Sequence, residues 1–282
     1  VSWFSSDTRI SLPSEELEGW EDSGKRDLYR AGLSRITDAG AADRAGNWIR
    51  VSRDGGTLWE EPVRVPLTAP HGPIVTSDGR LFFLGKGHLK ELGDTTQVQA
   101  GIGAMVSATD YTSWDALGTV PLADGTDGTN YFEPHVVELE HRRFLGLIRV
   151  QDWKKQGGLQ KAGITSFSMA QTRSDDGGVT WSKAEPLNFH GSPPHVFRHS
   201  SGVLACVYGY RREPYGERVM LSYNEGDTWH YHFILRDDGP DIDLGYPSSV
   251  ELSDGSILSV YYQKISSSVE KPSLLWSRWR LP

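Results

Sequence analysis

The fold of this chain is decided by a short motif, best seen in Ser174-Asp175-Asp176-Gly177-Gly178-Val179-Thr180-Trp181. The Asp176 carboxylate can accept hydrogen bonds from the backbone amides of a tight turn. The two glycines supply the positive φ angles that such a turn requires, and Trp181 can bury its ring in a core beside the turn. The stretch therefore predicts a tight connection between two antiparallel strands.

The same motif recurs along the chain. Clear copies lie at 52–59 and 222–229, the second with Asn224 in place of the aspartate, and a degenerate copy at 107–114 keeps only the serine and the tryptophan. The closing tryptophans stand at positions 59, 114, 181 and 229, so they are 55, 67 and 48 residues apart. A motif repeated at such a period indicates a repeat architecture, in which each copy belongs to one supersecondary unit.

Between the motifs lies a second repeated pattern, which consists of an apolar strand, a polar turn and another apolar strand. Residues 74–84 read IVTSDGRLFFL and residues 250–260 read VELSDGSILSV, with looser copies at 136–148 and 196–207. These two strands and the two that flank the motif make four antiparallel strands about every 50–65 residues, which describes a propeller blade. Almost no helix is expected. The best short candidate is 13–24, inside a loop over 10–45.

Composition narrows the class of protein. The chain has 282 residues and a formal net charge of −8, which argues against a nucleic-acid backbone as its main partner. Its 31 glycines, 10 tryptophans and 11 tyrosines suit a turn-rich β protein. The sequence contains no apolar run of about 18 residues that would span a membrane. Cys206 is its single cysteine, which excludes an internal disulfide and a cysteine-cluster metal site.

The Ser-x-Asp-x-Gly-x-Thr-Trp motif, repeated at blade spacing over most of the chain, resembles the Asp-box (BNR) repeat of the sialidase superfamily. That resemblance implies an all-β, sialidase-like β-propeller, which has six blades in the family. The second strands of the hairpins are expected to begin near Val1, Leu81, Phe144, Val203 and Ile257, which is about five blades' worth of strands. We therefore expect residues 1–282 to form a single propeller domain that is incomplete at its N-terminus, with a closed five-bladed ring as the alternative.

Strand direction predicts which face of the propeller carries the chemistry. In an antiparallel blade, the starts of the innermost strands and the ends of the second strands lie on one face, opposite the repeated motifs. Polar and titratable side chains gather at both sets of positions. At the starts of the innermost strands they are His71, Glu133, His135, His195 and Tyr246. At the ends of the second strands they are Asp7, Arg9, Lys86, Arg149, Arg211, Arg212 and Gln263.

Four of these residues follow an order similar to that of a sialidase site: Glu133, Arg149, one of Arg211 and Arg212, then Tyr246. The resemblance implies that Glu133 activates Tyr246 as the nucleophile and that arginines bind the substrate carboxylate. Planar guanidinium groups bind a carboxylate through paired hydrogen bonds, and a neutral tyrosine is not repelled by that anion but needs a base. Adjacent strand residues point to opposite faces, so only one of the neighbouring arginines can point inward, and Arg211 is preferred.

The predicted function is hydrolysis of a terminal acidic sugar, sialic acid or a similar sugar. The other polar residues of the predicted face are expected to bind the substrate. No metal and no cofactor is predicted, and a glycan or glycoconjugate substrate favours a secreted or cell-surface role. The sequence has Gln263 where the family has a glutamate, and the first arginine and the acid/base aspartate of the family are expected upstream of Val1. Two alternatives stay open: a uronate lyase that uses histidine and tyrosine, and a propeller that binds glycans without cleaving them.

Overall fold

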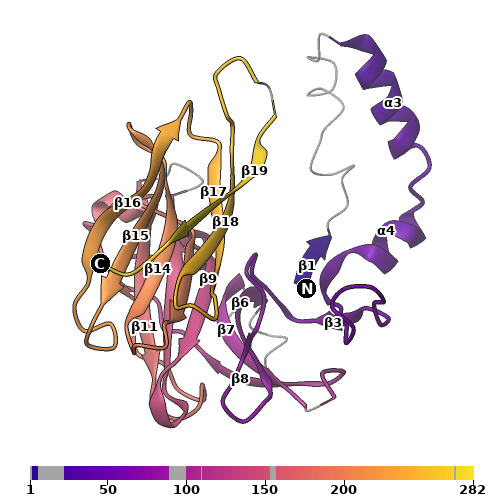
Figure 1. Ribbon diagram of the computed structural model, residues 1–282. Helices are drawn as coiled ribbons and strands as arrows, with labels where there is room; N and C mark the ends of the chain where they lie inside the picture. The colour runs from indigo at the N-terminus through magenta and orange to yellow at the C-terminus, as the bar shows by residue number, and fades with distance from the viewer. Residues whose placement is uncertain (1, 6–21, 89–99, 109, 153–156, 270) are drawn as a thin grey trace. The chain divides into compact units, whose positions relative to one another are not determined.

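The computed structural model describes residues 2–5, 22–88, 100–108, 110–152, 157–269 and 271–282 (Figure 1). The chain divides into two compact units, Val1–Pro66 and Leu67–Pro282. The first unit contains a three-stranded antiparallel sheet, in the order β1 (Ser2–Ser5), β2 (Gly46–Ile49) and β3 (Val63–Val65). It also contains two helices, α3 (Ser23–Leu33) and α4 (Asp38–Arg44).

Four antiparallel sheets follow one another along the second unit. The first contains β4 (Leu67–Thr68), β5 (Ile74–Val75), β6 (Leu81–His88), β7 (Ala100–Ser107) and β8 (Trp114–Thr119). The second contains β9 (Tyr131–Glu138), β10 (Phe144–Val150), β11 (Ser168–Ser174) and β12 (Glu185–Pro186). The third contains β13 (Pro194–Arg198), β14 (Leu204–Tyr210), β15 (Tyr215–Ser222) and β16 (His230–Gly239). The fourth contains β17 (Leu244–Glu251), β18 (Ile257–Gln263) and β19 (Ser273–Trp279).

The predicted all-β, sialidase-like propeller fold is confirmed. Each sheet of the second unit pairs strands that are neighbours in sequence, which is the meander of a propeller blade. The second strand of each predicted hairpin begins at Ser2, Leu81, Phe144, Leu204 or Ile257, within one residue of its expected start. The single domain over 1–282, incomplete at its N-terminus, stays a prediction.

The helices of the first unit correct the expectation of a loop over 10–45. Asp22 caps α3 by accepting a hydrogen bond from the Lys25 amide at 3.0 Å, and Thr37 caps α4 by accepting one from the Gly40 amide at 3.0 Å. Neither helix has a buried residue, and both are rich in polar and small residues, so the sequence signal for a helix packed on a core is weak. Among the described residues, no helix is long and apolar enough to cross a membrane.

The repeated motif forms the turn that its residues predict. The Asp176 carboxylate accepts hydrogen bonds from the backbone amides of Val179 and Thr180 at 3.1 and 2.8 Å. The Ser174 hydroxyl donates to Asp176 at 2.9 Å and accepts from the Gly178 amide at 2.8 Å. Trp181 is 7% exposed, and its indole N–H donates to the Gly178 carbonyl at 3.0 Å. The motif is thus a self-contained hydrogen-bonded turn with a buried ring at its end.

Replacing Asp176 with alanine should destabilise this turn without changing the opposite face. Several turn amides would lose their acceptor, and we expect the free energy of unfolding to fall by about 1–2 kcal/mol. Thermal or urea unfolding of the variant measures the loss. Asp175→Ala is the matched control, because Asp175 is exposed and is the neighbouring carboxylate of the same turn. Equal stability of the two variants would contradict the structural role of Asp176.

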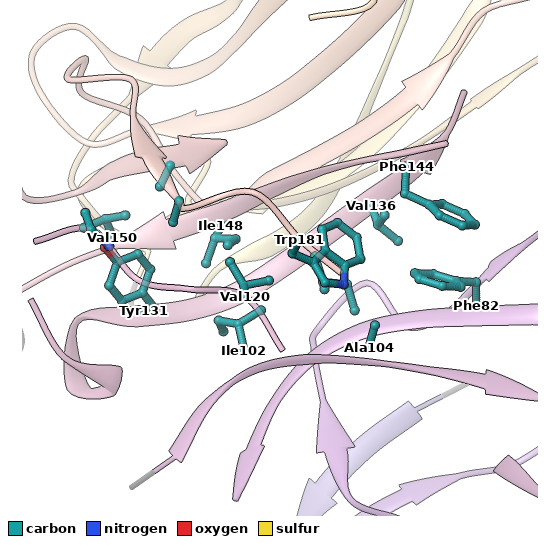
Figure 2. Packing of buried hydrophobic residues seen from close by; sticks show 14 of the residues in the cluster. Phe82, Ile102, Ala104, Val120, Tyr131, Val136, Phe144, Ile148, Val150 and Trp181 are labelled. Carbon is teal, nitrogen blue, oxygen red and sulfur yellow. The ribbon is translucent and has the colours of Figure 1, made fainter. Parts of the chain in front are cut away.

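The sheets of the second unit pack face to face through aromatic and aliphatic side chains. In the core between the first two sheets, the Phe82 and Phe144 rings stack with centroids 4.0 Å apart (Figure 2). Trp181 lies beside them, with its ring centroid 6.3 Å from that of Phe82. Each such side chain contributes roughly 1.5–3 kcal/mol when fully buried. This packing fixes neighbouring blades against one another, which positions the side chains at their inner edges.

Candidate active site

The candidate site lies on the inner strands of the second unit. The strand β13 contacts both β9 and β17, although the three strands belong to different sheets. Glu133 lies in β9 and Tyr246 lies in β17. Arg149 lies near the end of β10, the second strand of the β9 sheet. The predicted face therefore brings together residues that are 16 and 113 positions apart in the chain.

Glu133, Tyr246 and Arg149 form one hydrogen-bonded group. The Tyr246 hydroxyl donates to Glu133 Oε1 at 2.6 Å. Arg149 Nη1 donates to Glu133 Oε2 at 2.5 Å and to the Tyr246 oxygen at 3.2 Å. A tyrosine whose proton already points at a carboxylate is set up to lose that proton as it attacks an electrophile. The neighbouring guanidinium would stabilise the negative charge that develops on the phenolic oxygen.

Two equivalent β-bulges aim Glu133 and Tyr246. In β9, Phe132 pairs with Arg149 and His135 with Leu147, so Glu133 and Pro134 share one partner position. In β17 the register also shifts between Gly245 and Ser248, so Tyr246 and Pro247 share one partner position in β18. Glu133 has φ of 46° and Tyr246 has φ of 53°, which are uncommon for residues other than glycine. Bulges re-aim side chains, and the two Glu-Pro and Tyr-Pro pairs are the sequence signal for them.

The environment keeps Tyr246 protonated at neutral pH. Burial and the charge of Glu133 raise the pKa of Tyr246 to about 12, although Arg149 opposes both effects. The phenol is therefore a poor nucleophile until Glu133 accepts its proton. Both side chains remain partly exposed, so a substrate can reach them. Arg149, which orients the pair, is only 6% exposed.

Arg211 points inward, as preferred, but it binds backbone. Its guanidinium donates to the carbonyls of Ser192 at 2.5 Å, Leu244 at 2.6 Å and Ile242 at 3.2 Å. It also lies 6.0 Å from the centre of the Tyr246 ring. These bonds, with a further hydrogen bond to the Tyr262 side chain, fix the guanidinium between Ser192 and the start of β17. Its neighbour Arg212 is exposed.

Lys86 adds a second cation beside Glu133. Its ammonium group donates to the Gly128 carbonyl at 3.0 Å and lies 3.6 Å from the centre of the Phe132 ring. Burial lowers the pKa of Lys86 to about 8, opposed by the charges of Asp127 and Glu133, so the side chain is mostly charged at neutral pH. A chain with a net charge of −8 therefore has a site in which cations outnumber the central carboxylate.

The three predicted histidines pack against one another beneath the pair. The His135 and His195 rings stack with centroids 4.5 Å apart, and the His71 ring lies 5.2 Å from each. His71 Nε2 is 2.9 Å from the Pro247 carbonyl oxygen, so that nitrogen carries the proton and ties the bulge of Tyr246. His135 and His195 are 5% and 8% exposed, which does not support substrate contact by either.

The histidine cluster is neutral. Burial lowers the pKa of His71 to about 4 and that of His195 to about 3, and it holds the pKa of His135 well below its usual range. Among the described residues, no group of three or more His, Cys, Asp or Glu side chains is arranged to hold a metal ion. The cluster is therefore a packing and positioning element in this structure.

Three predicted residues remain, namely Gln263, Asp7 and Arg9. Gln263 is 1% exposed, and its Nε2 donates to Asp238 at 3.1 Å, which links β18 to β16 rather than to Glu133 or Tyr246. Asp7 and Arg9 lie outside the described residues. The prediction that these three side chains bind substrate stays untested.

Two residues of the site were not predicted. Arg149 Nη2 donates to Gln151 Oε1, and the Arg149 guanidinium lies 5.3 Å from the centre of the Phe167 ring. Gln151 is two positions after Arg149 and shares its side of the strand end, which is a usable sequence signal. Phe167 follows a loop, and no pattern in the sequence points to it.

Glu217 is a buried acid close to Arg211 and Arg218, and it was not predicted from the sequence. It is 0% exposed, and both its carboxyl oxygens lack a hydrogen-bond partner within the described part of the chain. Burial raises the pKa of Glu217 to about 8, although the charges of Arg211 and Arg218 lower it. Glu217 is therefore protonated at neutral pH, a state that removes the cost of a buried carboxylate.

Glu217→Gln should remove a pH-dependent loss of stability. The folded pKa of about 8 exceeds the usual 4.5. Between those values the unfolded chain is deprotonated and the folded chain is not, so stability falls as pH rises. Relative to wild type, the glutamine variant should gain about 2 kcal/mol between about pH 5.5 and about pH 7.5. Denaturant unfolding at both pH values measures this gain, with exposed Glu213→Gln as control. A gain that does not change with pH would contradict the protonated state.

A family model of BNR repeat-like domains matches residues 29–259. The chain belongs to this family. It is therefore a member of the sialidase-like BNR-repeat propellers, as the repeated motif predicted. No curated protein matches the sequence.

Solved structures with the same fold include several glycoside hydrolases. A protein of unknown function from Dyadobacter fermentans is 21% identical, with a TM-score of 0.67 over 88% of this chain and 67% of its own. The intramolecular trans-sialidase of Ruminococcus gnavus, solved with oseltamivir carboxylate, is 19% identical, with a TM-score of 0.53 over 84% of this chain. An α-L-arabinofuranosidase of Fusarium graminearum is 15% identical, with a TM-score of 0.53, also over 84%. At these identities the BNR-repeat propeller shares their fold, and it spans 51% of the trans-sialidase.

Proposed function

We propose that this BNR-repeat propeller is a glycoside hydrolase of sialidase type that removes a terminal acidic sugar. The observation that carries the proposal is the group formed by Tyr246, Glu133 and Arg149, with the Tyr246 hydroxyl 2.6 Å from Glu133. A tyrosine nucleophile is the known arrangement of sialidases among glycosidases. That several proteins of this fold are glycoside hydrolases supports hydrolysis in general. The acidic sugar is inferred from the charges of the site.

In the proposed reaction, the Tyr246 oxygen attacks the anomeric carbon while its proton passes to Glu133. The bond from that carbon to the leaving oxygen breaks, and the leaving oxygen takes a proton from an acid that the three residues do not provide. A water molecule then attacks the same carbon and gives one proton to the conjugate base of that acid, while the bond to Tyr246 breaks and the phenolate recovers its proton from Glu133. The two displacements make the reaction retaining.

The charges favour an anionic sugar. A carboxylate nucleophile would be repelled by a substrate carboxylate on the anomeric carbon, whereas Tyr246 is neutral until it reacts. Arg149, Arg211 and Lys86 offer positive charge around Glu133 and Tyr246. Arg149 keeps one Nη2 proton and its Nε proton outside the hydrogen bonds to Glu133, Tyr246 and Gln151.

The lyase alternative gains no support from the histidines. Proton abstraction needs a base with an accessible lone pair and a pKa near the working pH. His71 and His195 have a pKa of about 4 and about 3 because they are buried. Glycan binding without cleavage remains the alternative that the experiment must separate.

A panel of fluorogenic glycosides tests the proposal with the full chain. We expect release of the fluorophore from an α-sialoside, and no release from an α-L-arabinofuranoside, a β-galactoside or a β-xyloside. Turnover of a neutral glycoside alone would overturn the acidic-sugar assignment. Binding of sialosides on a glycan array with no turnover would favour the non-catalytic alternative, and a new ultraviolet-absorbing product from uronate polymers would favour the lyase.

A further inference from the structure

A pocket of about 710 Å³ lies next to the side chains that contact Arg149. It is formed by the end of β10, the short helix α5 (Gly158–Lys161) and the segment that leads into β11. Two of its lining residues, Gln151 and Phe167, are the same residues that hold the Arg149 guanidinium. The pocket therefore borders the candidate site, and nothing in the proposed reaction uses it.

The lining of the pocket suits an uncharged, amphipathic ligand. Phe167 provides partly exposed apolar surface above the buried Leu159 and Ile164, and Asp152 and Gln160 provide accessible hydrogen-bonding groups. None of the described residues that line the pocket is Lys, Arg or His. Its volume is within the roughly 300–1,000 Å³ of small-molecule sites, which is more than one exocyclic group of a sugar needs.

Phe167 is held in a costly conformation at the edge of this pocket. Its φ of 57° is uncommon for an aromatic residue. The Gly191 amide fixes it by donating to the Phe167 carbonyl at 2.7 Å. The ring lies between the Arg149 guanidinium, at 5.3 Å, and the His190 ring, at 6.0 Å between centroids. The ring is thus locked in place yet still partly exposed, as a platform for the apolar face of a sugar should be.

We propose that this pocket binds the neutral sugar to which the acidic sugar is attached. The inference rests on the proposed function, because Tyr246 and Arg149 then mark the position of the acidic sugar and the pocket adjoins that position. Carbon-bound hydrogens of a pyranose ring would pack on Phe167, which is partly exposed. Its hydroxyl groups would bond to Asp152 and to the amide group of Gln160.

Kinetics on two substrates test the assignment. One is 3′-sialyllactose, whose leaving group is a neutral disaccharide, and the other is an aryl sialoside, whose leaving group has no sugar. Gln160→Ala and Phe167→Leu should each lower kcat/KM for 3′-sialyllactose about tenfold relative to the aryl sialoside. Lys161→Ala is the matched control, because Lys161 is exposed on the same helix but does not line the pocket. Its ratio between the two substrates should not change.

Equal losses on both substrates, or no loss on either, would overturn the proposal, since equal losses mean that the pocket serves the acidic sugar or the fold. Binding of lactose provides a readout that does not need turnover. Lactose titrated into the wild-type chain and followed by NMR should bind in the millimolar range, and Gln160→Ala should weaken it while Lys161→Ala should not. This binding without hydrolysis of any sialoside would refute the proposed function and keep the pocket. Hydrolysis without pocket-dependent binding would refute the pocket alone.

Discussion

The Tyr246→Phe variant should lose turnover of an aryl sialoside by about 10³-fold or more while it folds as the wild type does. Phenylalanine keeps the ring that stacks with Tyr262, with centroids 5.9 Å apart, and that lies 6.0 Å from Arg211. It removes only the oxygen that would attack the sugar. Steady-state turnover of the fluorogenic sialoside measures the loss, and thermal unfolding checks the fold.

Tyr262→Phe is the matched control for this prediction. Tyr262 has its ring against Tyr246, but its hydroxyl donates to Asp243 at 2.9 Å and not to Glu133. Loss of that hydroxyl should change activity by less than about threefold, which is the cost of a surface hydrogen bond. If Tyr246→Phe retained more than a tenth of the wild-type kcat, Tyr246 would not be the nucleophile.

Glu133→Gln should lower kcat by about 10²–10⁴-fold, the range for loss of a general base. Glutamine has nearly the same size and can still accept a hydrogen bond from the Tyr246 hydroxyl. It cannot take the proton, and it loses the ion pair with Arg149 at 2.5 Å. The phenol would then attack only as the neutral group, since burial and the protein environment hold its pKa near 12 in the wild type.

Glu138→Gln controls for a charge lost from the same strand. Glu138 lies in β9 and accepts hydrogen bonds from the Ser77 amide at 2.6 Å and the Ser77 hydroxyl at 2.9 Å. This change should lower stability and leave kcat within about threefold of wild type, because a lost hydrogen bond acts on the fold. Equal kcat for Glu133→Gln and Glu138→Gln would show that Glu133 takes no proton in the reaction.

The fold could be predicted because its signals are local. A motif such as 174–181 contains both the donors and the acceptors of its own turn. The alternation of the hairpins then fixes which strand ends share a face, which placed Glu133, Arg149 and Tyr246 together in advance. The helix α3 escaped prediction because its sequence is mostly polar and none of its residues is buried.

The burial of each side chain and the groups that it contacts could not be predicted from the strand pattern. Sequence position placed His195 and Arg211 on the predicted face, but how deeply they are buried depends on side chains from three different sheets. In the structure His195 packs on His71 and His135, and Arg211 binds the backbone carbonyls of Ser192 and Leu244. Arg211 and Arg218 are close to Glu217 in sequence, but its complete burial in β15 could not be predicted from the strand pattern.

The two bulges also indicate how such a site can originate. Glu133 and Tyr246 precede a proline at the same point of the inner strand in two different repeats, and each has a left-handed backbone. A chain that grows by duplicating a blade inherits one copy of this kink with every copy of the blade. In such a chain, the proposed base and nucleophile would be two later substitutions at equivalent positions of two repeats. An asymmetric pair would then need no new backbone, only divergence between the repeats.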